Sequence, residues 1–172
     1  MTLEEKNEYE TLNQLIAQYK QRMTELNPFA NLKDMSNKEF GETWSENYIC
    51  TRVSSFERKD EKGWDLYSPA LGRVEVKSTR LPCKQITFNQ CHPYDCDYFL
   101  FVEYDTIEGD VFMFLVPSSD FFEFNPSVQH TRSNKEDADC FTMSGCSRSN
   151  VYNLQKYRVS SWEELEQRAK GE

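Results

Sequence analysis

Apolar residues recur at helical intervals in the first part of the chain. Between residues 3 and 26, most side chains are polar and the apolar ones are three or four positions apart. This spacing places them on one face of an α-helix. The sequence therefore predicts a helix over 3–26, with the stripe buried and the helix ending at Asn27-Pro28. The stripe consists of Leu12, Leu15, Ile16, Tyr19 and Met23.

Two further helices are predicted from their start signals. Ser36 is followed three residues later by Glu39, a capping-box pattern, and aromatic residues then recur at helical spacing. We expect a helix over about 37–52. Ser161 with a glutamate three residues on repeats the pattern and predicts a C-terminal helix over about 161–170.

Between these helices the pattern changes to short strands. The runs at 97–104 and 110–116 are almost continuously apolar, which is typical of strands covered by helices on both faces. The segment 85–95 fits either a short helix or an irregular loop, and 125–150 is polar, with one short strand expected near 139–143. Turn residues predict a charged turn at 57–63 and a hairpin turn at 68–72. The expected strands are 53–56, 64–67, 73–78, 97–104 and 110–116.

Composition limits the class of protein. With 172 residues, of which 38% are apolar, the chain has the length of one domain with a substantial core. No run approaches the roughly 20 apolar residues of a membrane span, and the charged start lacks the apolar segment of a signal peptide. We expect a soluble cytoplasmic protein that has no membrane partner. The formal charge of −9 is unusual for a protein that binds nucleic acid, although net charge describes the whole surface and not a cleft.

The six cysteines lack the paired Cys-x2-Cys spacing of zinc fingers. We expect mainly reduced, partly buried thiols. A structural zinc site remains an alternative interpretation, built from Cys83, Cys91, His92 and Cys96, or including the pair Cys140 and Cys146.

Acidic and basic residues on one predicted hairpin suggest a reaction. Alternate side chains of a strand share a face, so Glu75 and Lys77 emerge together while Val74 and Val76 enter a core. Asp65 lies on the preceding strand. Two carboxylates can hold a divalent cation beside a phosphate, and an ammonium group can position water or offset negative charge. A solvated charged face on a surface hairpin is the competing interpretation.

The order of elements and these residues resemble the PD-(D/E)XK nuclease superfamily, in its restriction-endonuclease-like and resolvase-like members. The similarity covers residues 37–116 and includes Gly41-Glu42, Gly63-Trp64-Asp65-Leu66 and Val74-Glu75-Val76-Lys77. Trp64 replaces the proline of the family signature. The resemblance implies an α/β fold with a restriction-endonuclease-like core, in which helices flank a central mixed sheet in αβββαβ order. The whole chain, 1–172, would then be one nuclease-like domain with a C-terminal extension.

The resemblance also implies an activity, an Mg²⁺-dependent endonuclease acting on duplex DNA. Asp65, Glu75 and the Val76 carbonyl would bind Mg²⁺, for which Mn²⁺ would substitute, and Lys77 would hold the attacking water. Glu42 would complete the site, with Glu46 as the alternative helix carboxylate. No other cofactor is implied, and a restriction-type role would require a homodimer to cut both strands.

Contacts to DNA would have to come from residues near the site. Candidates for these contacts are Arg73, Arg80, Lys84 and Gln85. Two other functions remain open: a catalytically silent nucleic-acid-binding protein with the nuclease fold, and an acidic module that binds a basic protein partner.

Overall fold

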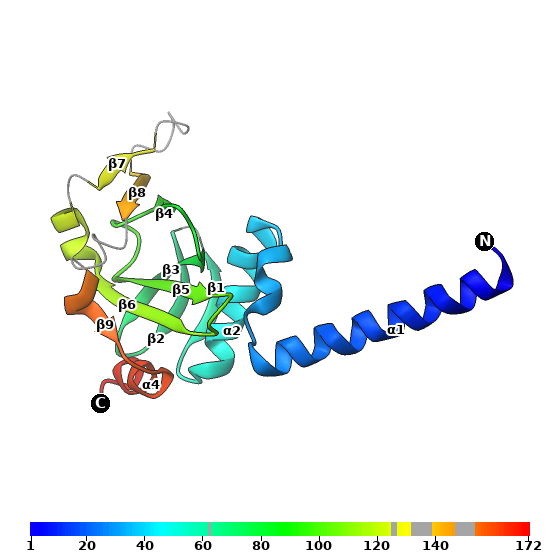
Figure 1. Ribbon diagram of the computed structural model, residues 1–172. Coiled ribbons are helices and arrows are strands. Elements are labelled where there is room, and N and C mark those ends of the chain that lie inside the picture. Colours follow the sequence, from blue (N-terminus) through cyan, green and yellow to red (C-terminus); the bar gives the residue numbers. More distant parts are fainter. Residues whose placement is uncertain (62, 125–126, 132–138, 147–153) are drawn as a thin grey trace.

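The computed structural model describes residues 1–61, 63–124, 127–131, 139–146 and 154–172, and for Glu42, Asp60, Gly145 and Cys146 it describes the backbone alone. The described chain contains a large mixed sheet, a smaller antiparallel sheet and several helices (Figure 1). This confirms an α/β protein with a central mixed sheet.

The large sheet has the order β1-β2-β3-β5-β6-β9. Neighbouring strands are antiparallel except for β3 and β5, which pair in parallel from Val74–Tyr98 to Leu81–Asp105. The hairpin β2–β3 forms where the turn residues predicted it, and Gly72 takes the positive φ of +73° that closes it. The strands are β1 Glu57–Glu61, β2 Trp64–Ser68, β3 Gly72–Leu81, β5 Tyr98–Asp105, β6 Val111–Pro117 and β9 Arg158–Val159.

The small sheet changes the predicted topology. It has the order β4-β8-β7, formed by β4 Ile86–Cys91, β8 Phe141–Cys146 and β7 Val128–His130. The connection from β3 to its parallel neighbour β5 thus carries a strand, and residues 82–97 contain no helix. The predicted αβββαβ order was wrong for its second helix, because strand β4 lies in that place. Residues 85–95 are therefore neither the short helix nor the irregular loop that the sequence predicted. Ile86 and Phe88 are buried with an intervening half-buried Thr87, a period of two that fits a strand.

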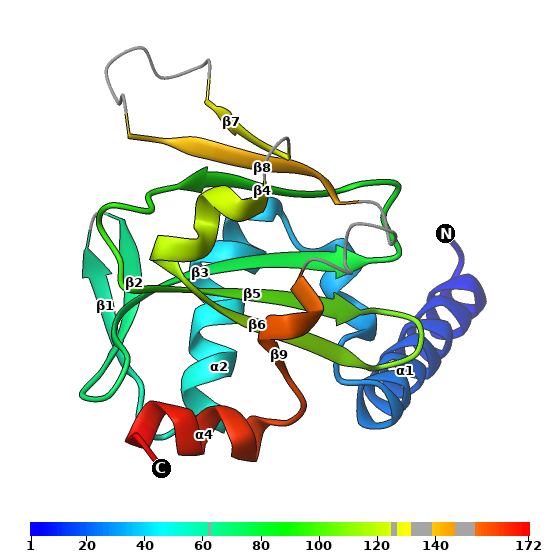
Figure 2. The ribbon, with the colours of Figure 1, turned by 90° about the vertical axis from the view of Figure 1, so that its left-hand side faces the viewer.

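The large sheet is covered differently on its two faces (Figure 2). On one face, helices α2 (Glu46–Arg52) and α4 (Trp162–Lys170) bury a core that includes Leu100 and Val102. On the other, the small sheet and the 3₁₀ helix η3 (Ser118–Phe124) bury Phe99 and Phe101. The prediction that helices cover both faces was therefore wrong for one face. An apolar strand needs an apolar cover, and a second sheet can supply that cover as well as a helix can.

The second predicted helix is confirmed over 37–52, with a π-helical stretch, η2 (Glu39–Ser45), leading directly into α2. The Glu39 amide donates to the Ser36 hydroxyl, as the start signal predicted. The predicted strand 53–56 is a turn, and β1 forms within the predicted turn 57–63. The C-terminal helix is also confirmed, with Ser161 as its cap. Short 3₁₀ helices occur at η1 (Ala30–Asp34) and η4 (Gln155–Tyr157).

Helix α1 spans Leu3–Leu26, as predicted, but it projects away from the sheets (Figure 1). None of its residues is buried. The prediction of a buried stripe was wrong, because amphipathic spacing shows that a face can be covered and not what covers it. Among the described residues, none of the helices combines the length and apolar character needed to cross a membrane.

Candidate active site

A cleft of about 640 Å³ opens along the part of β3 that continues past the end of β2. The β2–β3 pairing runs from Ser68–Gly72 to Leu66–Val74, whereas β3 continues to Leu81. The start of the second helix forms one wall and β4 the other. The walls are lined by Asn37, Lys38, Phe40 and Gly41 on the helix side and by Thr87, Phe88, Asn89 and Gln90 on β4.

The hairpin brings the predicted catalytic residues together on the floor of this cleft. Asp65, Glu75 and Lys77 all line it. Val74, with its neighbour Leu66 on β2, is fully buried in the core against α2, so the alternation of the strands turns Glu75 and Lys77 to the opposite face. The sequence predicted this separation of faces correctly.

Among the described charged groups of the cleft, Glu75 is the most enclosed, with its side chain 3% exposed. Its Oε1 lies 2.8 Å from Lys77 Nζ and 3.3 Å from His92 Nδ1, and its Oε2 accepts the His92 backbone N–H at 2.8 Å. A carboxylate has about four acceptor positions, so these contacts leave it room for a further ligand. The residues around Glu75 hold it in one orientation.

Asp65 has a simpler environment. Its Oδ2 accepts the Val76 N–H at 2.7 Å, and within the described residues its Oδ1 accepts no hydrogen bond. Burial raises the pKa of Asp65 above its usual value, and the nearby Glu75 carboxylate adds to this, although the Val76 amide and Lys77 act in the opposite direction. The neighbours of Asp65 therefore do not fully balance the negative charge of its ionised form. A bound cation would balance it.

Lys77 remains an ammonium group in this setting. Burial acts to lower its pKa, but attraction to Glu75, with a smaller effect of Asp65, outweighs burial and raises the pKa above the usual lysine value. Protonated lysine donates hydrogen bonds and cannot accept a proton. Its chemistry here is therefore that of a fixed positive charge beside two carboxylates.

The second helix contributes a carboxylate to the cleft. Glu46 lines it, is 7% exposed and accepts from Arg58 Nε of β1 at 3.0 Å. The buried Ser45 hydroxyl is hydrogen-bonded to Ser78 of β3, which fixes the helix beside the cleft. The side chain of Glu42, the preferred helix carboxylate of the sequence prediction, lies outside the described part. Among the described side chains of this helix, Glu46, the alternative, is the carboxylate that lines the cleft.

The four predicted DNA-contacting residues separate into two groups. Arg73 pairs with Asp97, and neither it nor the exposed Lys84 and Gln85 lines the cleft. Arg80 does line it, but its Nη1 donates to the carbonyls of Leu32 and Met35, each at 2.7 Å. Its Nη2 donates to Asn37, and its guanidinium lies over the Phe40 ring. Arg80 therefore fastens the segment that leads into the second helix.

Arg80→Lys is expected to lower the free energy of unfolding by about 2 kcal/mol, because an ammonium group cannot reach the same divergent acceptors and leaves backbone carbonyls unpaired. Urea unfolding measures this loss. Arg73→Lys is the matched control, and its more exposed pair should cost less than about 1 kcal/mol. Unchanged stability with weakened DNA binding in Arg80→Lys would instead assign Arg80 to the substrate.

Sequence reasoning missed the contacts of His92 with Glu75 and the strand β4 that carries Asn89 and Gln90. His92 was considered only as a zinc ligand, yet both its backbone N–H and its ring contact Glu75. Asn89 and Gln90 line the cleft opposite the helix. The alternating pattern of Ile86-Thr87-Phe88-Asn89 was the available signal for the strand that carries them.

The donors at the cleft fit magnesium better than zinc. In the described ranges, no set of three or more His, Cys, Asp or Glu side chains is arranged to hold a metal ion. Magnesium commonly takes one or two protein carboxylates and keeps several waters, so Asp65 and Glu75 suffice for it. Burial raises the pKa of Cys91 and of Cys96, so both thiols are protonated in the metal-free protein.

Comparison with known proteins gives no independent assignment. No protein-family model matches the chain, and no curated protein matches it.

Proposed function

We propose that this protein is a divalent-metal-dependent endonuclease of the PD-(D/E)XK type that hydrolyses phosphodiester bonds in duplex DNA. The observation that supports this most strongly is the placement of Asp65, Glu75 and Lys77 together on the floor of one cleft. The mixed sheet with its β2–β3 hairpin is compatible with a restriction-endonuclease-like core. In this chain, strand β4 would take the place of the helix expected between β3 and β5.

Each residue would have a distinct role. Asp65 and Glu75, with the Val76 carbonyl, would hold Mg²⁺, which when bound stabilises negative charge on the phosphate and on the leaving oxygen. Lys77, anchored by Glu75, would donate a hydrogen bond to the attacking water and offset charge at phosphorus. His92 would orient Glu75 through its backbone and ring contacts. Glu46 would orient water at the helix side of the cleft.

The charge of the cleft supports a substrate that binds together with the cation. Among the described lining side chains, the basic Lys38, Lys77 and Arg80 are balanced by three carboxylates. Lys77 pairs with Glu75, and Arg80 donates to backbone carbonyls. A bound divalent ion would make the floor positive, and amide side chains on the walls can donate to phosphate oxygens. These amides are Asn37, Asn89 and Gln90.

The proposal is tested by incubating purified protein with Mg²⁺ or with EDTA and a panel of substrates. The panel contains supercoiled, linear, branched and single-stranded DNA and duplex RNA. We expect Mg²⁺-dependent cleavage of duplex DNA, and faster cleavage of branched DNA or of RNA would redefine the substrate. Absence of cleavage on every substrate, with DNA still bound, would overturn the enzyme assignment in favour of a silent nucleic-acid-binding protein.

A further inference from the structure

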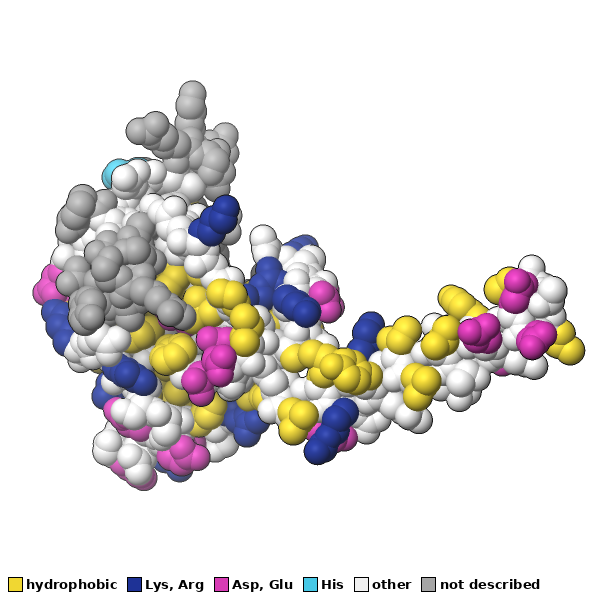
Figure 3. All heavy atoms as spheres, in the orientation of Figure 1, with side chains coloured by type: hydrophobic (Ala, Val, Ile, Leu, Met, Phe, Trp, Pro, Cys, Tyr) yellow, Lys and Arg dark blue, Asp and Glu magenta, His cyan; other side chains and the backbone are white. Residues whose placement is uncertain are grey.

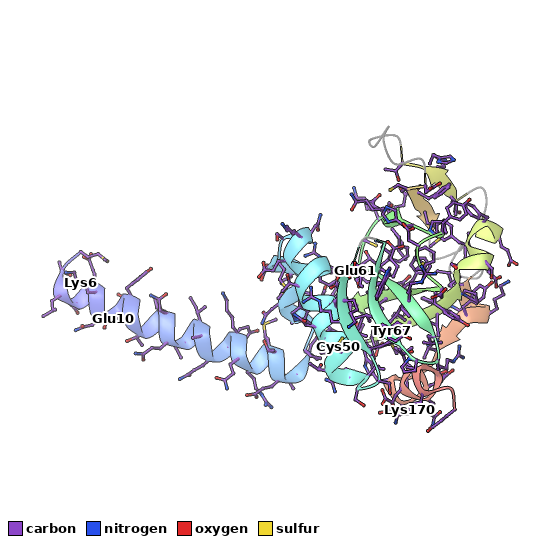
Figure 4. All side chains as sticks on the ribbon, turned by 180° about the vertical axis from the view of Figure 1, so that it is seen from behind. Lys6, Glu10, Cys50, Glu61, Tyr67 and Lys170 are labelled. Carbon is purple, nitrogen blue, oxygen red and sulfur yellow. The ribbon has the colours of Figure 1, made fainter. Side chains whose placement is uncertain are left out.

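Helix α1 carries an apolar face that is largely exposed in the described chain, with Met23 half-buried. Tyr9, Leu12, Ile16 and Tyr19 are 51–69% exposed, and Leu26 is 71% exposed. Figure 3 shows apolar side chains along the length of the projecting helix. Seen from behind, Lys6 and Glu10 mark its free end, far from the sheets (Figure 4). Most helices in proteins are stabilised by packing of their apolar face, and the described chain supplies little such packing to this 24-residue helix.

The exposed face follows the heptad rule of coiled coils. The apolar positions are separated alternately by three and four residues over more than two heptads, which aligns them along one seam. The spacing is also symmetric about the middle of the helix, so the reversed sequence has its apolar residues in the same places. The seam consists of Tyr9, Leu12, Ile16, Tyr19, Met23 and Leu26.

We propose that α1 pairs with α1 of a second copy of this chain as an antiparallel coiled coil. In this arrangement each a position faces a d position of the other helix. Ile16 then faces Tyr19 of the partner subunit, Leu12 faces Met23 of the partner subunit, and Tyr9 faces Leu26 of the partner subunit. All six seam residues gain an apolar partner, because the spacing is symmetric.

Charge favours the antiparallel direction. The first half of α1 carries four glutamates and one lysine, whereas the second half carries Lys20 and Arg22 with one glutamate. Antiparallel pairing in this register separates the two acidic ends, whereas parallel pairing would place the four glutamates of one helix beside those of the other. The glutamates of the first half are Glu4, Glu5, Glu8 and Glu10.

The apolar area matches a dimer of moderate affinity. Twelve seam side chains, at on the order of 60–120 Å² for an aliphatic residue and more for tyrosine, would bury roughly 1,000 Å². Flanking side chains add to this, which brings the total close to the range of about 1,200–2,000 Å² for stable protein interfaces. We therefore expect a concentration-dependent dimer of the 20.4 kDa chain.

Sedimentation velocity of the full chain over a range of concentrations tests the interface. We expect association to twice 20.4 kDa and its loss in Leu12→Asp/Ile16→Asp. The matched control, Gln14→Asp/Gln18→Asp, places the same charges outside the seam and should still dimerise. A wild-type chain that stays monomeric at the highest attainable concentration would overturn the proposal, as would a dimer unaffected by the seam substitutions.

Disulfide trapping tests the direction of pairing, in a Cys83→Ser background because Cys83 is exposed. A mixture of Leu12→Cys and Met23→Cys chains should form a cross-linked heterodimer under mild oxidation. Leu12→Cys alone should not, because two copies of residue 12 would be about 16 Å apart along antiparallel helices, beyond the roughly 7 Å reach of a disulfide. Efficient cross-linking of Leu12→Cys alone would contradict the antiparallel arrangement.

This interface is independent of the catalytic proposal. A dimer that cleaves nothing would leave it standing, and an active nuclease that remains monomeric would overturn it. Binding of a monomeric chain to lipid vesicles, abolished by the Leu12→Asp/Ile16→Asp variant, would reassign the seam to a membrane surface and would also overturn the dimer.

Discussion

Asp65→Asn is expected to reduce Mg²⁺-dependent cleavage by at least roughly 100- to 1,000-fold while leaving the protein as stable as the wild type or more stable. Burial and the nearby Glu75 raise the pKa of Asp65, so its ionised form is unfavourable in the folded state without a cation. Asparagine keeps an oxygen that can accept the Val76 N–H. The cleavage rate and urea unfolding, measured on the same preparation, test both parts.

The sign of the pH dependence follows from the same shift. A folded pKa raised above the unfolded value gives a stabilising contribution that is complete below the unfolded pKa and is lost as pH rises through the folded pKa. The stability advantage of Asp65→Asn should therefore be absent in acid and appear as the pH rises toward neutrality. Urea unfolding of both proteins across this pH range measures it.

Asp97→Asn is the matched control for Asp65→Asn, with the opposite expected pattern. Hydrogen bonds from Arg73 lower the pKa of Asp97, so its charge is stabilising above the unfolded pKa and the variant should be less stable at neutral pH. Asp97 does not line the cleft, so cleavage should persist. Wild-type cleavage by Asp65→Asn would contradict the assignment of Asp65.

Glu75→Gln is expected to lower the free energy of unfolding by about 3 kcal/mol and to abolish cleavage. Lys77 Nζ lies 2.8 Å from Glu75, with its side chain only 19% exposed, so the substitution leaves a largely buried ammonium group without its closest counter-charge. The glutamine oxygen can still accept the His92 N–H, so the loss should come mainly from Lys77. Urea unfolding at neutral pH measures the change.

The double variant Glu75→Gln/Lys77→Met separates stability from catalysis. Removing both charges and keeping the apolar stem of the lysine should restore most of the lost stability, because the cost of the single variant is an uncompensated charge. Cleavage should remain absent. A double variant as unstable as Glu75→Gln would show that the ion pair is not the source of the effect.

The centre of the site could be predicted because it depends on local rules. Strand alternation alone places Glu75 and Lys77 on the face opposite Val74, and the turn residues of the hairpin bring Asp65 alongside. The capping signals at Ser36 and Ser161 are equally local, and both helices begin where they predicted.

The features that could not be predicted depend on contacts between distant segments. Arg80 resembles a DNA contact in sequence, but its carbonyl partners are 45 and 48 residues upstream. His92 reaches Glu75 only because β4 folds over the sheet as part of a second sheet, whose partner strand β8 begins at Phe141. For α1 the amphipathic pattern was read correctly, but the sequence alone could not show that this face does not pack on the chain's own core.

The most direct measurement for the central claim is a crystal structure of the protein soaked in Mn²⁺, with anomalous scattering used to locate the ion. We expect a peak within about 2–2.5 Å of carboxylate oxygens of both Asp65 and Glu75 in the cleft. The same soak of Asp65→Asn should show the peak lost or much weakened. A peak at other residues, or an active enzyme without a peak between these carboxylates, would contradict the account.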